Sequence, residues 1–336
     1  MRTGSGWWVA AVVATLLGTA CSREPARTKP AAGKVKIGYL VKQPEEPWFQ
    51  VEWQFAEKAG KDLGFDVIKL AVPDAEKTLA AIDNLAAQGV PGFVICTPDV
   101  RLGPAIVAKA RAAGMKLITV DDQFLGADGK IMGDVHHLGV AARDVGHVSG
   151  QSLWEQFKKR GWTAEDTAAC IVTFDELDTA RERTQGIIEK LVDNGFPRER
   201  IFTTPQKTTD IPGSFDAANI LLTQHADVKH WLAAGMNDTA SLGAVRALEG
   251  RGFDAETAVA IGINGTDCMD DLKRTPPTPF YGSILMEANV HGYDTSAAMY
   301  RWVAQAVEPP LARFTGGVLI TRETFEKTLK EHGMWR

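Results

Sequence analysis

The sequence predicts an α/β protein with two doubly wound lobes, each built on a parallel sheet. From Val35 onward, short apolar runs typical of buried strands alternate with segments whose apolar residues recur at helical spacing. Strands that alternate with helices form parallel sheets through right-handed crossovers. Two such series follow each other in the 336 residues, a length suited to about two domains. A crevice lined by strand ends from both lobes is a favoured place for a small-molecule site.

The first series contains four strands and three helices. Strands are expected at residues 35–41, 66–72, 92–97 and 116–120, and helices at 50–63, 76–88 and 104–113. Gly64 and Gly114 follow two of these helices, where glycine commonly ends a helix. The last strand leads directly into Asp121 and Asp122.

The second series begins with a long helix, which we expect to run from His137 to Arg160. Strands are then expected at 168–173, 201–204, 230–235, 259–263, 280–285 and 317–321, and helices at 179–194, 213–225, 240–250 and 289–307. Polar residues again follow the strands, with Asn237 and Asp238 after one and Asn264 after the next.

Residues 1–21 predict an export signal. Arg2 precedes an apolar run that is too short for a membrane span, and small residues follow it. The run ends at Cys21 in a context that resembles a lipoprotein cleavage site, so Cys21 is a candidate for lipidation; ordinary cleavage after Ala20 is the alternative. Residues 22–33 are polar and rich in Pro and Ala, which predicts a flexible tether. We therefore expect the folded part to be exported to the periplasm.

Composition excludes several classes of function. The net charge is −5 and Lys and Arg form no long cluster, which argues against a nucleic-acid surface. The four cysteines lie far apart, with no CxxC spacing and no Cys/His cluster. We expect no nucleic-acid partner, no metal site and no cofactor.

The loop from Lys42 to Phe49 has an unusual composition. It lies at the carboxyl end of the first predicted strand, where open α/β sheets place their ligands. It offers one cation, two carboxylates and two adjacent aromatic residues, Trp48 and Phe49, and two prolines stiffen it. Such a set suits a sugar, which has hydroxyls at its edge and a weakly apolar face. The alternative interpretation makes the two aromatic residues core positions at a helix start.

Other predicted strands also end in polar residues. These residues are Asp121, Asp122, Asn237, Asp238, Asn264 and, slightly further along, Asp267. Arg183 lies in the first turns of a predicted helix and adds a cation. Each sugar hydroxyl donates once and accepts twice, and this set supplies acceptor-only, donor-only and mixed groups. Their joint placement favours a polyhydroxyl ligand.

Six motifs resemble those of the type I periplasmic binding proteins, in particular the arabinose-binding members. The motifs are Lys42-Gln-Pro-Glu-Glu-Pro-Trp-Phe-Gln50, Phe93-Val-Ile-Cys-Thr-Pro98, Val120-Asp-Asp-Gln-Phe124, Glu176-Leu-Asp-Thr-Ala-Arg181, Gly235-Met-Asn-Asp238 and Gly262-Ile-Asn-Gly265. Their order and spacing agree over nearly the whole chain after residue 34. The resemblance implies a hinge-closing sugar receptor, not an enzyme, that delivers its ligand to an ABC transporter permease and acts as a monomer.

The resemblance also implies the residues that contact the sugar. They are Lys42, Glu46, Trp48, Phe49, Asp121, Asp122, Leu177, Thr179, Arg183, Met236, Asn237, Asn264 and Asp267. Lys42 is implied as a direct donor and Asp122 as the acceptor from the anomeric hydroxyl. Arg183, Asn237 and Asn264 are implied as direct contacts from the other side of the cleft.

Two positions depart from the family pattern. Gly139 and Val140 stand where the family has a Met-Met pair, and Met286 stands where it has a proline. Both changes could alter the room around the C5 substituent of the sugar. The choice among L-arabinose, D-galactose, D-fucose and D-xylose therefore stays open.

The chain is expected to cross between the lobes three times, near residues 140, 286 and 315, because the helix after Met286 completes the first lobe. This three-stranded hinge would divide the chain into a first lobe of residues 34–140 and 287–314 and a second of residues 141–286 and 315–336.

Three other functions compete with that of a sugar receptor. A glycosidase with Asp121 and Asp122 as its carboxylate pair is disfavoured, because adjacent residues of an extended segment point to opposite faces. A sugar-responsive transcription regulator would need a helix-turn-helix segment where this chain has the export signal. A sensor that reports the sugar to a membrane chemoreceptor or kinase is compatible with every motif.

Overall fold

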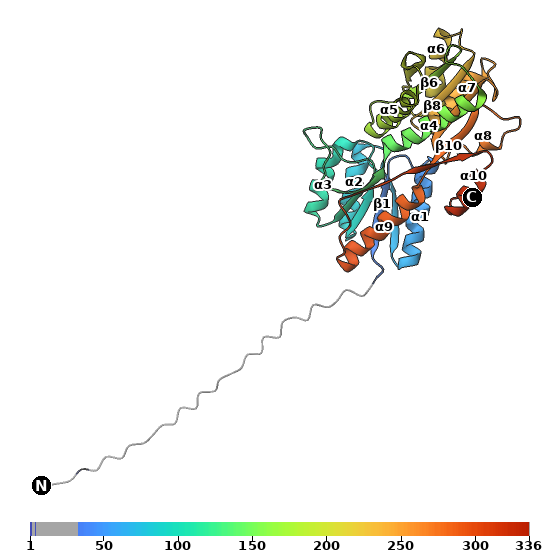
Figure 1. The fold of residues 1–336 in the computed structure, drawn as a ribbon. Coiled ribbons are helices and arrows are strands. Elements are labelled where there is room, and N and C mark those ends of the chain that lie inside the picture. Colours follow the sequence, from blue (N-terminus) through green and yellow to red (C-terminus); the bar gives the residue numbers. More distant parts are fainter. Residues whose placement is uncertain (2–3, 5–32, 336) are drawn as a thin grey trace. The chain divides into compact units, whose positions relative to one another are not determined.

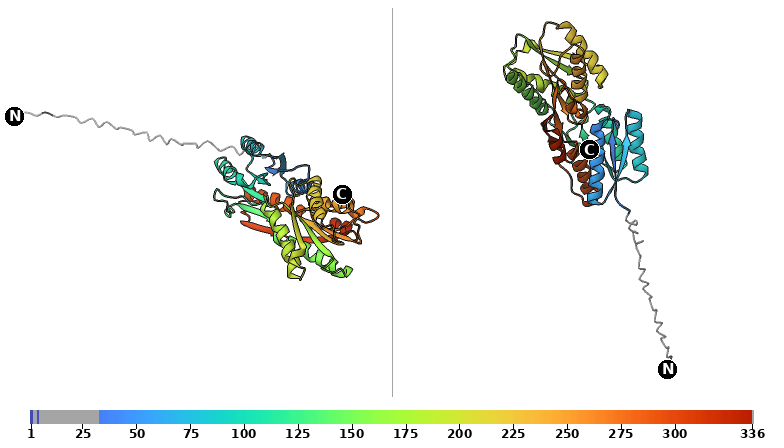
Figure 2. Two further views of the ribbon diagram at one scale, coloured as in Figure 1. Left: turned by 90° about the horizontal axis from the view of Figure 1, so that it is seen from above. Right: turned by 90° about the vertical axis from the view of Figure 1, so that its right-hand side faces the viewer.

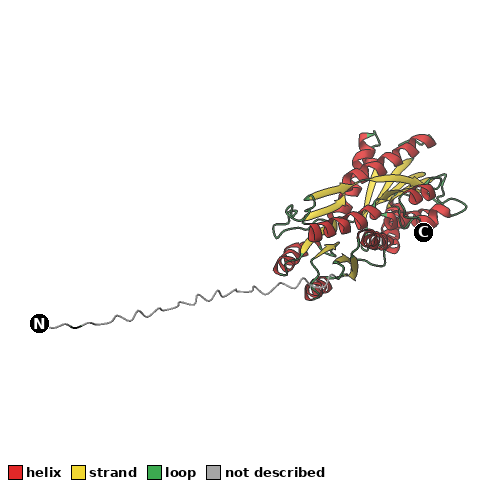
Figure 3. Ribbon diagram, turned by 90° about the horizontal axis from the view of Figure 1, so that it is seen from below, coloured by secondary structure: helices red, strands yellow, loops and turns green. Residues whose placement is uncertain are grey.

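The computed structural model describes residues 1, 4 and 33–335, and the chain from Lys34 onward forms one compact unit. The predicted signal, the Cys21 site and nearly all of the tether lie outside the described residues. Two six-stranded sheets organise the compact unit, and helices flank both of them (Figure 1, Figure 3). No helix in the described part of the chain is long and apolar enough to cross a membrane.

The first sheet is entirely parallel and has the order β11-β5-β4-β3-β1-β2. Its strands are β1 (Lys36–Val41), β2 (Asp66–Ala71), β3 (Gly92–Ile95), β4 (Lys116–Asp121), β5 (His136–Val140) and β11 (Ala312–Thr315). One face carries α1 (Pro47–Leu63) and α9 (Ala288–Gln305), and the other carries α2 (Ala75–Ala87) and α3 (Gly103–Ala112), which follows the 3-10 turn η1 (Val100–Leu102). Although far apart in the sequence, α1 and α9 pack side by side (Figure 2).

The second sheet has the order β12-β10-β9-β8-β6-β7, and only its edge strand β12 is antiparallel. Its strands are β6 (Thr167–Thr173), β7 (Ile201–Pro205), β8 (His230–Gly235), β9 (Ala258–Asn264), β10 (Phe280–Met286) and β12 (Gly317–Thr321). The helices α4 (Ala142–Arg160) and α5 (Asp178–Asp193) pack together, as do α6 (Ile211–Gln224) and α7 (Asp238–Glu249). The short elements η2 (Arg198–Arg200), α8 (Met269–Lys273) and α10 (Phe325–Glu331) complete this lobe.

The central strands are buried on both faces, as parallel sheets covered by helices require. Every residue of β3, β6 and β9 is buried. Helix boundaries follow local chemistry: α1 begins at Pro47 and ends at Gly64, which adopts the left-handed conformation with φ 83°. The helix begins three residues before the predicted start at Gln50, so Trp48 and Phe49 lie in its first turn rather than in the preceding loop.

Three segments connect the sheets, and we call them the hinge: residues 139–142, 286–288 and 315–317. The first joins β5 to α4, the second joins β10 to α9, and the third joins β11 to β12. The prediction of two α/β lobes linked by three crossings is therefore confirmed. The second sheet is not purely parallel, because β12 enters it directly from the hinge, without a crossover helix, and pairs antiparallel with β10.

One predicted element is wrong. Residues 136–140 form the strand β5, and the long helix begins only at Ala142. Both His136 and His137 are buried rather than at a helix start, and His137 Nδ1 lies 2.9 Å from Thr119 Oγ1 of the neighbouring strand. Pairing with β4 and β11 on either side decides the conformation of this segment, and that pairing has no local signal. The strand β11 is not predicted from the sequence either, because it too depends on pairing with a distant strand, β5.

Candidate functional site

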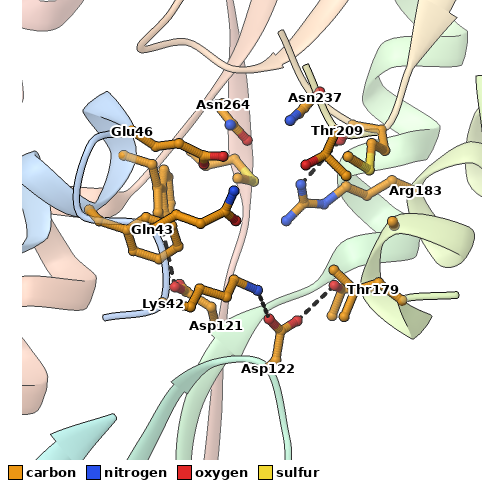
Figure 4. Close-up of a pocket in the computed structure, with 16 residues that line it drawn as sticks. Lys42, Gln43, Glu46, Asp121, Asp122, Thr179, Arg183, Thr209, Asn237 and Asn264 are labelled. Atoms are coloured by element: carbon orange, nitrogen blue, oxygen red, sulfur yellow. Dashed lines mark hydrogen bonds and ion pairs between the residues drawn. The ribbon is translucent and has the colours of Figure 1, made fainter. Parts of the chain in front are cut away.

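A pocket lies where the carboxyl ends of strands from both sheets meet (Figure 4). The space between its walls, together with the open solvent at its mouth, amounts to about 610 Å³. Its lining residues are Lys42, Gln43, Glu46, Trp48, Phe49, Asp121, Asp122, Leu177, Thr179, Ala180, Arg183, Thr209, Met236, Asn237, Asn264 and Met286. Of the 13 predicted contact residues, every one except Asp267 is in this set.

Lys42 and Asp122 form an ion pair at the base of the pocket in the view of Figure 4. Lys42 Nζ donates to Asp122 Oδ2 over 2.8 Å, and Thr179 Oγ1 donates to Asp122 Oδ1 over 2.8 Å from the other lobe. Asp122 is only 4% exposed. Burial alone would lower the pKa of Lys42, but the adjacent Asp122 carboxylate raises it above its ordinary value. The pair offers a ligand a charged donor beside a charged acceptor.

The aromatic residues of the loop form one wall. Trp48 and Phe49 occupy the first turn of α1, and both are buried while still lining the pocket. Trp48 Nε1 donates to Asp121 Oδ2 over 3.2 Å, which fixes the orientation of the indole. The two residues are therefore core positions at a helix start, as the alternative interpretation has it, and they also line the pocket.

Asp121 has an unusual backbone conformation. Its φ is 65°, in the left-handed region that few residues other than Gly, Asn and Asp adopt. His291 Nδ1 lies 2.8 Å from Asp121 Oδ1, so the carboxylate is bonded on both oxygens. Burial raises the pKa of Asp121, but the hydrogen bond and charge of His291, with further help from Lys42 and the Trp48 N–H, lower it to about 2. Asp121 is thus a fixed anion in the lining of the pocket.

The opposite wall comes from the second lobe. Arg183 Nη1 donates to the carbonyl of Met236 over 3.1 Å, and its Nε has no hydrogen-bond partner among the described residues. Asn237 caps α7 because its Oδ1 accepts from the N–H of Ala240 and the hydroxyl of Thr239. The Asn237 amide nitrogen is consequently the group that it can offer to a ligand. Burial lowers the pKa of Arg183 from its ordinary value.

Glu46 lines the pocket and interacts with carboxyls that are not part of the lining. Burial, followed by the charge of Asp267, raises the pKa of Glu46 to about 7. The same two causes raise the pKa of Asp238, which lies below the surface, to about 7. Asp267 is not among the lining residues, and its backbone N–H donates to Asp238 Oδ2. Its charge acts on the pocket by raising the pKa of Glu46.

Four lining residues are not among the predicted contact residues: Gln43, Ala180, Thr209 and Met286. Gln43 is inside the predicted loop and Ala180 inside a predicted motif, so position alone could have identified them. Thr209 comes from the segment before α6, which has no motif. Of the two departures from the family pattern, Met286 lines this pocket, whereas Val140 lies beside a neighbouring one that Asp121, Asp122 and Leu177 also line.

One set of potential metal ligands occurs in the described residues: the donor atoms of Glu52, Asp121 and His291 all lie within 4.8 Å of one another. His291 Nδ1 and Asp121 Oδ1 are at hydrogen-bond distance, so the ring and the carboxylate already satisfy each other. Glu52, the third member of the set, has no hydrogen-bond partner among the described residues. What the pocket presents to a ligand is fixed cations, anions and amide donors beside an aromatic face.

Comparisons with known proteins support this description. A family model described as "Periplasmic binding proteins and sugar binding domain of LacI family" matches residues 34–328. The chain is 55% identical over 304 residues to the L-arabinose-binding periplasmic protein of Escherichia coli (strain K12), which covers 90% of this chain and 92% of that protein. It is 43% identical over 305 residues to the ABC transporter L-arabinose-binding periplasmic protein of Azospirillum brasilense, covering 90% and 91%. These matches confirm the resemblance that the motifs indicated, and both relatives are named as binding proteins rather than enzymes.

Solved structures share the fold. An ABC transporter periplasmic solute binding protein from Actinobacillus succinogenes with bound D-allose has a TM-score of 0.74 at 18% identity, covering 88% of this chain and 100% of that one. AraP, an arabinose binding protein from Geobacillus stearothermophilus, has a TM-score of 0.69 at 16% identity, covering 88% and 99%. At these identities the likeness shows the two-lobed architecture alone.

Proposed function

Because this chain belongs to the family of periplasmic binding proteins and sugar-binding domains, we propose that it captures L-arabinose or a related monosaccharide between its lobes and delivers it to an ABC importer. The related sugars that the pocket could accommodate are D-galactose, D-fucose and D-xylose. The observation that carries the proposal is the Lys42–Asp122–Thr179 group, which places a donor and an acceptor beside an aromatic wall at the junction of the lobes.

The proposed contacts divide between the lobes. Lys42 and Asp122 of the first lobe bond to the sugar hydroxyls, while Trp48 and Phe49 cover the weakly apolar face of the ring. The remaining proposed contacts are Glu46, Asp121, Leu177, Thr179, Arg183, Met236, Asn237 and Asn264, with Asp267 acting through its charge. Charge-assisted hydrogen bonds of this kind are about twice as strong as neutral ones.

Closure of the lobes on the sugar follows from this division. A sugar held by Lys42 and Asp122 reaches Arg183 and Asn237 only when the lobes are together, so bound sugar favours the closed arrangement. We assign residues 34–140 and 287–314 to the first lobe and residues 141–286 and 315–336 to the second, in keeping with the strands in each sheet. The closed form is the one that the permease recognises.

The exported protein would act in the periplasm, after removal of residues 1–21 or with lipid attached to Cys21. A second candidate function is that of a sensor that presents the closed form to a chemoreceptor or kinase. Both functions use the same pocket and the same closure, and they differ only in the partner. We expect the protein to act as a monomer in either case.

The test is a titration of the purified protein, without residues 1–21, against a panel of pentoses and hexoses. Tryptophan fluorescence reports binding because Trp48 lines the pocket, and calorimetry gives the stoichiometry. Saturable binding of one sugar per chain, with the sugar recovered unchanged, supports the proposal. Absence of binding to every monosaccharide in the panel would overturn it.

A further inference from the structure

His291 is a buried side chain that none of the roles above uses. It lies in the first turn of α9, is 0% exposed, and is not among the residues that line the pocket. Its backbone N–H donates to the carbonyl of Glu287, in the hinge segment that enters α9. The backbone of His291 is therefore bonded to the hinge, while its ring contacts Asp121 of the pocket lining.

On one side, the ring holds the wall of the pocket. Its Nδ1 donates to Asp121 Oδ1 over 2.8 Å, since a carboxylate can only accept. The ring also meets the edge of Trp48, with centroids 5.5 Å apart and planes at 80°. Asp121 in turn accepts from Trp48 Nε1, so His291, Asp121 and Trp48 form a closed triangle. Because the left-handed backbone of Asp121 is intrinsically unfavourable, it needs such fixed partners.

On the other side, the ring reaches the remaining two hinge segments. Nε2 lies 2.8 Å from Thr315 Oγ1, at the end of β11. Thr315 Oγ1 is also 3.4 Å from the carbonyl of Gly139, and the Thr315 carbonyl accepts from the N–H of Ala141. One imidazole thus connects the site carboxylate to all three chain crossings: to one through its own backbone and to two through Thr315.

The ring is fully buried, and helix α1 packs closely against its Nδ1 side. Glu52 of α1 lies on the same side of the ring as Asp121, with Oε1 3.7 Å from Nδ1. The helices approach so closely that a Cβ at Gly292 would lie 2.1 Å from the Glu52 carbonyl oxygen. Both Glu52 carboxyl oxygens are buried without a hydrogen-bond partner among the described residues, and burial together with the charge of Asp121 raises the pKa of Glu52 well above its ordinary value. A neutral Glu52 leaves Asp121 as the acceptor for Nδ1.

We propose that His291 is a positioning residue that holds Asp121 and Trp48 in their binding geometry and, through Thr315, couples that geometry to the hinge. This inference rests on the proposed sugar-binding function. If it is correct, a change at Thr315, which does not line the pocket, alters sugar binding through the hinge alone. The dissociation rate should respond most, since the coupling stabilises the closed, sugar-bound form.

The experiment compares four variants with the wild type by stopped-flow tryptophan fluorescence and calorimetry with L-arabinose and D-galactose. His291→Gln removes the Nδ1 bond to Asp121, Thr315→Val removes the hydroxyl while keeping the shape, and Thr315→Ser keeps the hydroxyl. Thr78→Val is the matched control, because Thr78 is also a buried first-lobe threonine whose hydroxyl bonds to a nearby carbonyl, that of Asp74. Circular dichroism confirms that each variant is folded.

We expect dissociation from Thr315→Val to be about fivefold to tenfold faster, the effect of one lost hydrogen bond, with the association rate changed less than twofold. Thr315→Ser should restore the wild-type rate, Thr78→Val should match it, and His291→Gln should weaken binding of both sugars at least as much as Thr315→Val. If His291→Gln does not fold, the comparison of Thr315→Val with Thr315→Ser and with the control Thr78→Val tests the coupling.

If Thr315→Val bound sugar with the same rates as the wild type, the proposed coupling would be overturned. If Thr78→Val lost as much affinity as Thr315→Val, the loss would reflect general destabilisation, and the coupling would again be overturned. Neither result would affect the proposed function, because the wild type would still bind sugar. A wild-type protein that binds no sugar would overturn the proposed function, and this inference with it.

Discussion

Lys42 Nζ and Asp122 Oδ2 lie 2.8 Å apart across the carboxyl edge of the first sheet, and Thr179 of the other lobe bonds to the second oxygen of the same carboxylate. Asp122 is therefore the point at which the two lobes and the cationic donor of the pocket meet. The partners come from a loop, a strand end and a helix start that are separated by 80 and 57 residues. This relationship makes Asp122 the most informative position to change.

Asp122→Ala should raise the dissociation constant for the preferred sugar by at least about 30-fold, because truncating one member of a buried charge pair costs about 2–5 kcal/mol. Lys42 would then face the sugar without its acceptor partner. Calorimetry measures the change, and Asp128→Ala is the control, since Asp128 is exposed on a loop. A folded Asp122→Ala protein with wild-type affinity would contradict the proposed contact.

Trp48→Phe should abolish most of the fluorescence change on sugar binding and weaken affinity by about tenfold. The substitution keeps an aromatic face but removes the Nε1 donor to Asp121, and a lost bond to a charged group is worth about 1.5–3 kcal/mol. Trp162→Phe is the control, because Trp162 stacks on His230 of the second lobe and is not among the pocket residues. If the fluorescence change persisted in Trp48→Phe and disappeared in Trp162→Phe, Trp162 rather than Trp48 would be the residue that reports sugar binding.

Met286→Ala should shift preference toward D-galactose over L-arabinose. Met286 lines the pocket, and a smaller side chain leaves space for the extra carbon substituent of a hexose. Filling or opening the space of one methylene changes affinity by about 1–3 kcal/mol in such pockets. The ratio of the two dissociation constants is the measurement, and a ratio identical to that of the wild type would show that Met286 does not control the C5 region.

Stability should fall as pH rises from about 4 to 8, partly because of Asp238. Burial and the charge of Asp267 raise the pKa of Asp238 to about 7 in the folded protein, against an ordinary value of 3.8. Between these values the folded chain holds a proton that the unfolded chain releases, so this stability is present below pH 3.8 and is lost as pH rises through 7. Asp238→Asn should reduce this loss of stability by up to about 4 kcal/mol over the range, since each unit by which the pKa is raised corresponds to about 1.4 kcal/mol. Urea unfolding at several pH values checks it, with the exposed Asp134→Asn as the control.

Glu52→Gln should leave stability at neutral pH unchanged or slightly higher, whereas Glu52→Ala should cost about 2–4 kcal/mol through the cavity it leaves. The raised pKa of Glu52 means that the folded protein holds a proton there, which an amide mimics in shape and charge. The unfolding free energy of the wild type should decrease as pH rises above the ordinary pKa of 4.5, and that of Glu52→Gln should decrease less. Strong destabilisation by Glu52→Gln would mean that Glu52 is charged when folded.

Much of the fold and the pocket could be predicted because the signals are local. Apolar runs predict β1, β6 and β9, glycine predicts the end of α1, and the polar residues that follow each strand predict which side chains reach the crevice. The loop from Lys42 to Phe49 and the Asp121-Asp122 pair could be identified in this way, since parallel strands bring their carboxyl ends to one edge.

Other features depend on contacts between distant segments. The sequence by itself determined two α/β lobes and most of the groups that the pocket offers. Only the tertiary structure decided that His136–Val140 is a strand, because β4 and β11 pair with it from either side. It also decided that His291, 170 residues from Asp121, holds that carboxylate. The physical reason is that the edge of a strand and a buried polar side chain both need hydrogen-bonding partners. Here those partners come from segments far away in the sequence, which the crossings of the hinge bring together.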